Sequence, residues 1–219
     1  MHTEIGHLRS CLRWSAKIGR INRAPHLENV PKPDSDVNPL SMPELRRLLD
    51  NCRSAHTRLA VLLLFSTTAR VGAVLDLTWD RIDFERGIID LRLLDGVTRK
   101  GRAVVPMNSM IRPALKTACD SRICDHVIEH NGKPIGSIRT AYKNALRRAK
   151  LHSITFHQIR HTAAIMMLES GIDIEQVSQF FGHSNSQITR RTYARFTPEA
   201  MQPAADVLVL PVFQDAQKG

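Results

Sequence analysis

The sequence has few of the residues that would cross-link a fold or hold a metal. Its four cysteines, Cys11, Cys52, Cys119 and Cys124, form no Cys-x-x-Cys pair and fit no zinc ribbon. Scattered thiols of this kind indicate reduced cysteines in a cytosolic protein. The sequence also lacks a glycine-rich loop that could cradle a phosphate and a carboxylate cluster suited to a metal ion. We therefore expect no cofactor and no metal.

Long apolar segments are missing as well. The longest runs from Leu59 to Phe65, whereas a membrane-spanning helix needs about 20 apolar residues. We therefore expect no membrane partner. Hydrophobic residues still make up 42% of the 219 residues, which excludes a disordered chain and suits one large domain with a short appendage.

Positive charge is abundant, with 31 lysines and arginines against 21 acidic residues and a net charge of +10. Such a balance predicts a polyanionic partner, with nucleic acid the first candidate, rather than a small-molecule substrate. Arg139, Lys143 and Arg147 recur at helical spacing, and Arg190 and Arg191 form a second cluster. We expect both clusters to bind DNA phosphates, which positions a duplex without reading its sequence. The alternative is a solvated basic surface.

The N-terminal part is set apart by a proline-rich segment. Residues 4–23 favour an amphipathic helix, and prolines at 25, 31, 33 and 39 predict an extended linker. The main domain begins at Ser41, where Ser41 and Glu44 are typical of a capping box.

The main domain is predicted to be mainly α with a small antiparallel β-sheet, an α+β fold. Isoleucines and leucines between turn signals favour about three strands within residues 79–105. Helices are expected at about 41–49, 58–67, 71–75, 109–118, 138–150, 157–170, 174–181, 188–195 and 198–207.

The residue types needed for covalent cleavage of a phosphodiester are all present. Tyr193 is one of two tyrosines, and a phenol with a pKa of about 10 attacks phosphate only with help. Arg70 and Arg160 suit the non-bridging phosphate oxygens, because a guanidinium binds them through two parallel hydrogen bonds. His157 and His183 suit proton transfer near neutral pH.

The order Arg70, His157-x-x-Arg160, Gly182-His183 and Tyr193 resembles the tyrosine recombinases, or phage-type integrases, over about residues 41–205. The resemblance implies a DNA breaking-rejoining catalytic domain. In it Arg70 and Arg160 clamp the scissile phosphate, and Tyr193 attacks to leave a 3′-phosphotyrosine and a free 5′-hydroxyl. His157 would act as a proton acceptor or hydrogen-bond donor, and His183 would bind a non-bridging oxygen. Rejoining then needs neither ATP nor metal, because the ester keeps the bond energy.

Two positions depart from the family's pattern or leave it open. The family carries a hairpin lysine that protonates the leaving 5′-oxygen. Lys100 is our candidate, although Arg99 is the alternative occupant, and Arg99 and Arg102 are expected to bind DNA. The acidic residue that often follows the first arginine by three positions is Ala73 here, which would weaken activity.

The resemblance also implies a domain organisation and partners. Residues 1–39 would be the last helix of a core-binding domain plus linker, residues 40–205 the catalytic domain, and residues 206–219 a tail that docks on a neighbouring protomer. The expected partners are double-stranded DNA and further copies of the chain in a tetramer. We expect site-specific recombination and DNA integration in the cytoplasm, at the nucleoid, in a bacterium or phage.

Plainer interpretations stay open for single residues. Arg70 could cap a buried helix, and Tyr193 could be half-buried packing. His161 is predicted to be structural rather than catalytic. His157 and His161 have zinc-ligand spacing, so with His183 they could form a three-histidine metal site.

Two other functions also fit the sequence. One is a catalytically impaired, DNA-binding remnant of a truncated prophage integrase. The other is a monomeric topoisomerase that nicks and reseals DNA by similar chemistry.

Overall fold

The computed structural model describes residues 2–28, 38–92, 103–182 and 187–193. The chain divides into two compact units, Met1–Val37 and Asn38–Gly219. In the first unit, helix α1 (His2–Lys17) ends just before Gly19, whose φ of 74° suits the end of a helix. Apolar side chains are exposed along this helix, including Trp14 at 56%. The predicted helix is confirmed, and the predicted division into three segments stays a prediction.

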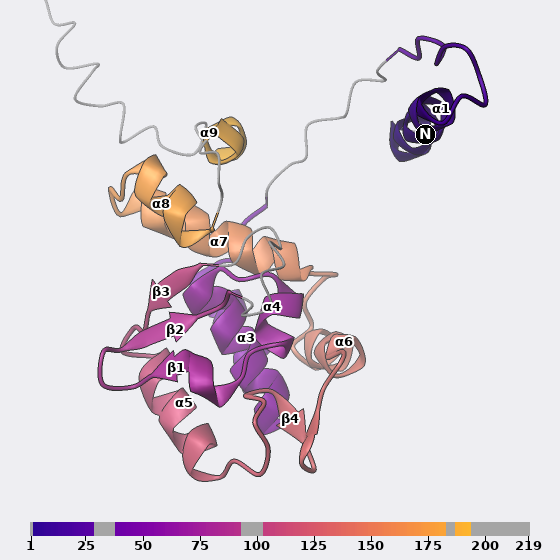
Figure 1. The fold of residues 1–219 in the computed structure, drawn as a ribbon. Helices are drawn as coiled ribbons and strands as arrows, with labels where there is room; N and C mark the ends of the chain where they lie inside the picture. Colours follow the sequence, from indigo (N-terminus) through magenta and orange to yellow (C-terminus); the bar gives the residue numbers. More distant parts are fainter. Residues whose placement is uncertain (1, 29–37, 93–102, 183–186, 194–219) are drawn as a thin grey trace, which may run out of the picture. The chain divides into compact units, whose positions relative to one another are not determined.

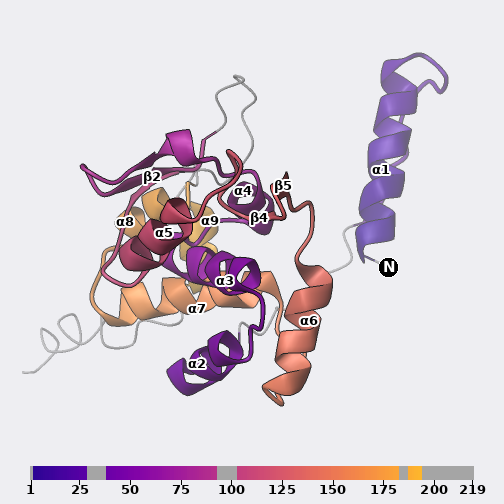
Figure 2. The same cartoon turned by 90° about the horizontal axis from the view of Figure 1, so that it is seen from below.

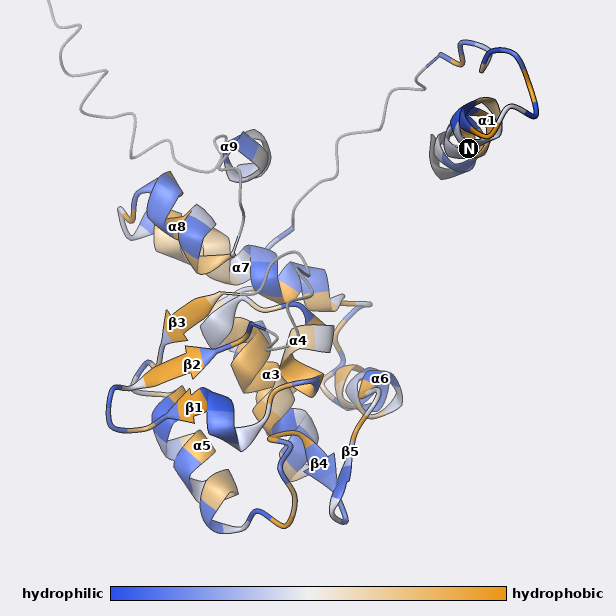
Figure 3. Cartoon of the chain, in the orientation of Figure 1, coloured by the Kyte–Doolittle hydropathy of each residue, from blue (hydrophilic) through white to orange (hydrophobic). Residues whose placement is uncertain are grey.

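The second unit is built around helix α3 (Ala55–Thr67), which contacts α2 (Met42–Asp50), α4 (Val71–Leu75), α5 (Ile111–Asp120) and α7 (Phe156–Glu169) (Figures 1 and 2). These neighbours leave α3 little contact with solvent. The helix is therefore apolar on most sides, as its colouring in Figure 3 shows. The core formed around α3 supports the loop and helix ends that carry the charged residues.

The small sheet lies beside α3 and α5 (Figure 1). Strands β1 (Ile82–Asp83), β2 (Ile88–Asp90) and β3 (Val104–Pro106) pair antiparallel in that order, with Ile89 opposite both Ile82 and Val105. A single turn of 3₁₀ helix, η1 (Trp79–Arg81), leads into β1. The predicted mainly α fold with a small antiparallel sheet is therefore confirmed.

A second hairpin was not predicted from the sequence. Strands β4 (Glu129–His130) and β5 (Lys133–Pro134) are joined by Asn131 and Gly132, whose φ angles are 53° and 75°. Positive φ at both central residues is the geometry of a tight two-residue hairpin turn, and Asn-Gly favours it.

The remaining helices are α6 (Arg139–Arg148), α8 (Ile174–Phe180) and α9 (Gln187–Tyr193). Every helix predicted within the described residues is found, with ends shifted by a few residues. The helix predicted at 198–207 lies outside the described residues. Within the described part of the chain, no helix is long and apolar enough to cross a membrane.

Candidate active site

A strained turn after α3 positions Arg70. Helix α3 ends at Thr68, whose φ of 51° places a β-branched residue in the left-handed region. Thr68 is buried, and its hydroxyl has no hydrogen-bond partner among the residues that the structure describes. Two residues after this turn, Arg70 is the N-cap of α4. Its side chain lines a cavity, and the plain interpretation, in which Arg70 caps the carbonyls of the preceding buried helix, stays a prediction.

A capping box fixes the start of α7, which carries the His-x-x-Arg motif. The backbone N–H of Gln158 donates to Thr155 Oγ1 at 3.2 Å. The backbone N–H of Thr155 donates to the side-chain Oε1 of Gln158 at 2.8 Å. Thr162 ties the helix to the start of the domain, since its hydroxyl accepts from the Leu40 amide at 2.8 Å. His157 and Arg160 thus project from a helix end that is held on both sides.

Arg160 is the centre of this arrangement and is only 5% exposed. Its guanidinium donates to the carbonyl of Thr68 and, at 3.1 Å, to the carbonyl of Phe181, and it lies 4.0 Å from the Phe181 ring centroid. Burial, assisted by the nearby charge of Arg70, lowers the pKa of Arg160 to about 9. The group therefore stays a cation at neutral pH and joins α3, α7 and the end of α8.

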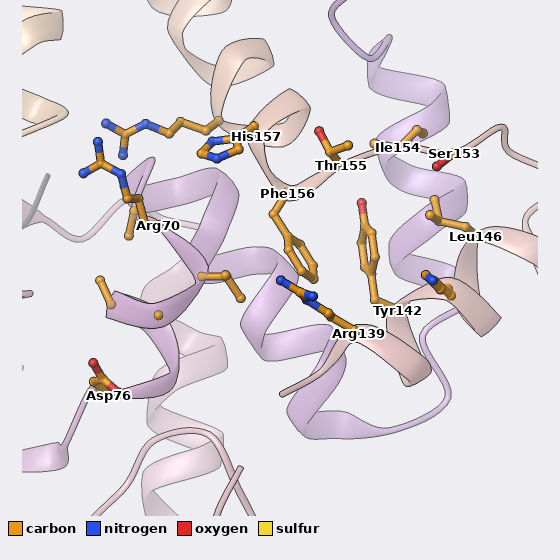
Figure 4. Close-up of a pocket in the computed structure, with 16 residues that line it drawn as sticks. Arg70, Asp76, Arg139, Tyr142, Leu146, Ser153, Ile154, Thr155, Phe156 and His157 are labelled. Carbon is orange, nitrogen blue, oxygen red and sulfur yellow. The ribbon is translucent and has the colours of Figure 1, made fainter. Parts of the chain in front are cut away.

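Arg70, His157 and Arg160 meet at a cavity of about 670 Å³. Figure 4 shows Arg70 and His157 close together on one side of it, with Arg139 and Tyr142 of α6 on another. Lys143 also lines the cavity, so four basic residues and a histidine surround one space. The other lining residues are Ala69, Val71, Gly72, Ala73, Asp76, Tyr142, Leu146, Ser153, Ile154, Thr155 and Phe156. A cavity with these charges suits a phosphate group with its flanking backbone.

Tyr193 lies at the end of α9 and is 2% exposed. Its hydroxyl makes a short contact with Nδ1 of His161, and its ring lies 6.0 Å from that of Phe181. Burial raises the pKa of the Tyr193 phenol, and the charge of Arg160 opposes that shift. Tyr193 is not among the described side chains that line the cavity.

His161, which the sequence predicts to be structural, is thus the histidine that touches the predicted nucleophile. His157 lies one helical turn away, with 6.5 Å between the ring centroids. Burial is the main cause that lowers the pKa of both histidines, and neighbouring cations add to it. The four-residue spacing already placed His161 on the same helix face as His157. The packing of α9 against that face could not be predicted from the sequence.

Some of the predicted DNA-binding residues line the cavity and others lie outside it. Arg139 and Lys143 line the cavity, whereas Arg147 is exposed outside it. Arg190 pairs with Glu175 of α8, with 2.9 Å between Nε and Oε1. Arg191 lies on α9. The candidates outside the described residues, or with side chains not described, are Arg99, Lys100, Arg102, His183 and Arg191.

Two further expectations bear on the site. Ala73 is buried and lines the cavity with a methyl group, so the carboxylate at the cavity comes from Asp76, the C-cap of α4. Among the described residues, no group of three histidine, cysteine or acidic side chains is placed to hold a metal ion. The three-histidine alternative includes His183 and so extends beyond what is described.

Comparison with known proteins identifies the class. Residues 39–199 match the phage integrase family. The chain is 26% identical to the tyrosine recombinase XerC-like protein of Caldanaerobacter subterraneus subsp. tengcongensis, over 81% of this chain and 55% of that protein. It is 30% identical to the tyrosine recombinase XerA of Thermococcus onnurineus, over 91% of this chain and 71% of that protein.

A solved structure agrees in fold. The Tn1549 transposon integrase in complex with a circular intermediate DNA superposes with a TM-score of 0.72 at 17% identity, covering 94% of this chain and 78% of that one. The chain belongs to the phage integrase family, and the resemblance predicted from its sequence is confirmed. It spans a little over half the length of the first of these relatives.

Proposed function

We propose that the chain cleaves and rejoins DNA in site-specific recombination, as an integrase that works through a covalent 3′-phosphotyrosine. The observation that carries this proposal is the cavity where Arg70, His157 and Arg160 meet. Fixed guanidinium groups act where charge develops on a phosphate in the transition state, and such preorganised contacts are a large part of catalysis. Tyr193 is the nucleophile, since its ring lies beside Arg160 and Phe181 at the edge of this clamp.

The roles of the remaining site residues follow from the family resemblance. His157 faces the phosphate from the rim of the cavity, and His183 binds a non-bridging oxygen. Lys100 protonates the leaving 5′-oxygen, and Arg99, Arg102, Arg139, Lys143, Arg147, Arg190 and Arg191 bind the phosphates on either side. No metal or cofactor enters the chemistry.

The wider organisation is also part of the proposal. Residues 40–205 form the catalytic domain, residues 1–39 the end of a core-binding domain with its linker, and residues 206–219 a tail that docks on a neighbouring protomer. Four protomers assemble on two duplexes, in the cytoplasm at the nucleoid. The support is the family membership, the basic charge and a structural neighbour that was solved with DNA.

A trapping experiment tests the chemistry. The chain is mixed with a pool of duplexes that carry a nick beside a randomised segment, so that cleavage releases a short strand and cannot be reversed. We expect a denaturation-resistant protein–DNA adduct that forms equally well in excess EDTA. Tight binding without an adduct would support a non-catalytic remnant instead. Relaxation of a supercoiled plasmid of unrelated sequence would favour a topoisomerase.

A further inference from the structure

The contact between Tyr193 and His161 has the form of a nucleophile with its base. A phenol needs a group within hydrogen-bond reach that can take its proton, and that group must itself be held in place. His161 meets both conditions, because its Nδ1 contacts the phenol oxygen and its ring is half-buried on helix α7. His157 contacts the cavity rather than the phenol.

We propose that His161 is the proton acceptor for Tyr193 during DNA cleavage. This rests on the proposed function. In the step, the phenol proton moves to Nδ1 of His161 while the phenol oxygen forms a bond to phosphorus. The bond between phosphorus and the 5′-oxygen breaks, and that oxygen takes a proton from a general acid, for which Lys100 is the candidate. Rejoining runs the same transfers in reverse.

The charges around His161 make its basicity depend on DNA. The titratable and charged groups that act on it are His157 and Arg160 of α7 and Tyr193 of α9. Burial, with the nearby His157 and Arg160, lowers the pKa of His161, which favours the neutral ring that can accept a proton. A phosphate anion in the cavity beside Arg160 offsets the positive charge and makes the imidazolium more favourable. The base therefore strengthens when substrate is bound.

In this proposal, the two histidines of α7 have different roles. His157 is on the side that lines the cavity, where it meets the phosphate, and His161 is one turn further along, where it meets the nucleophile. Arg160 lies between these two positions in the sequence and its charge acts on both rings. One short segment of helix thus provides the clamp, the phosphate contact and the base.

A spectroscopic test is independent of activity. ¹⁵N spectra of histidine-labelled protein give the tautomer and the pKa of each ring, and His161→Gln identifies the signal. We expect the tautomer with hydrogen on Nε2, and we expect the pKa of His161 to rise in Tyr193→Phe, because the phenol no longer stabilises the neutral ring. His157 serves as the control and should shift less. Hydrogen on Nδ1, or an unchanged pKa of His161, would overturn the proposal.

A kinetic test addresses the chemical step. In single-turnover trapping on the nicked duplex, His161→Ala and His161→Gln should slow adduct formation by about 10²-fold or more, as loss of a general base typically does. Added imidazole should partly restore His161→Ala. A substrate with sulfur in place of the bridging 5′-oxygen leaves without a proton, so it should rescue Lys100→Ala but not the His161 variants.

The outcomes separate the two proposals. Wild-type protein that forms no adduct on any duplex would defeat the proposed function, and this inference with it. Wild-type adduct formation together with His161 variants that react at the wild-type rate would defeat only the role of His161. Circular dichroism melting of each variant confirms that a slow variant is folded.

Discussion

The basic cavity and Tyr193, the proposed nucleophile, differ in how they are held. Arg70 and His157 stand at helix ends beside open space, on elements fixed by the core around α3. Tyr193 is buried on α9 and contacts His161 of α7, and it is not among the described residues that line the cavity. The difference teaches that the core around α3 positions the arginines, whereas the packing of α9 on α7 positions the phenol.

Arg160 is the residue that connects these two regions. It lines the cavity, yet its hydrogen bonds go to the carbonyls of Thr68 and Phe181. Phe181 in turn packs against Tyr193. The same guanidinium therefore supports the packing and has the proposed role at the phosphate, so variants of Arg160 must be judged on both stability and cleavage.

The largest expected effect is on the nucleophile itself. Tyr193→Phe should abolish the covalent adduct, since no other oxygen replaces the phenol, while DNA binding by the cavity stays. Tyr142→Phe is the matched comparison, because it removes the only other phenol of the chain, which lines the cavity and has no hydrogen-bond partner among the described residues. Denaturing gels of trapping reactions give the measurement. An adduct of undiminished yield in Tyr193→Phe would show that another group attacks.

The next effect concerns the clamp. Arg70→Ala and Arg160→Lys should each slow cleavage by about 10² to 10³, because a preorganised charge that acts in the transition state is lost. Arg160→Lys should also lower thermal stability, since an ammonium cannot reach both the Thr68 and Phe181 carbonyls in the planar geometry of a guanidinium. Single-turnover rates and melting curves separate the two losses. Wild-type cleavage rates in either variant would contradict the assignment.

A smaller effect is expected on binding at the far side of the cavity. Arg139→Ala and Lys143→Ala should each reduce the slope of log K against log salt by about one unit, which is the contribution of one phosphate contact. Lys116→Ala removes the same charge on α5, where Lys116 pairs with Asp120 at 3.0 Å, and serves as the control. Salt titrations of binding to one duplex give the slopes. Equal slopes in all three variants would mean that Arg139 and Lys143 belong to a solvated basic surface and do not contact DNA phosphates.

The smallest effect tests how well the helix start holds the clamp. Thr155→Ala removes the N-cap of α7 and should lower stability by about 1 kcal/mol. Ser41→Ala removes the equivalent cap from α2, away from the cavity, at a similar loss. Only Thr155→Ala should also slow cleavage, because His157 follows it in the first turn. Denaturant unfolding and trapping rates on the same samples provide the comparison, and equal trapping rates would argue that the cap is purely structural.

Much of this arrangement could be predicted from the sequence because local signals determine it. Ser41 with Glu44 forms the predicted capping box, and the apolar run around Leu63 forms the central helix. Turn signals at glycine and proline bounded the predicted strands. The spacing of the His-x-x-Arg motif predicted that His157 and Arg160 lie at one end of the same helix. These features depend on residues a few positions apart.

What could not be predicted depends on contacts between distant segments. The hairpin at Glu129–Pro134 has strands of two residues each, too short for an alternating pattern. The contact between His161 and Tyr193 joins residues 32 positions apart, and it depends on how α9 packs on α7 and α8. Likewise, no property of threonine predicts the left-handed backbone that Thr68 adopts at the C-cap of α3.

The contacts that hold helix α9 have a consequence for the timing of cleavage. Side-chain pairs tie its described residues to the neighbouring helices, Arg190 to Glu175 of α8 and Tyr193 to His161 of α7. Elements of this kind open locally at free energies far below that of global unfolding. Amide hydrogens of α9 should therefore exchange long before those of α3. Such a hierarchy would let α9 adjust to a bound phosphate, with the phenol still beside His161, while the elements that carry Arg70 and Arg160 stay folded.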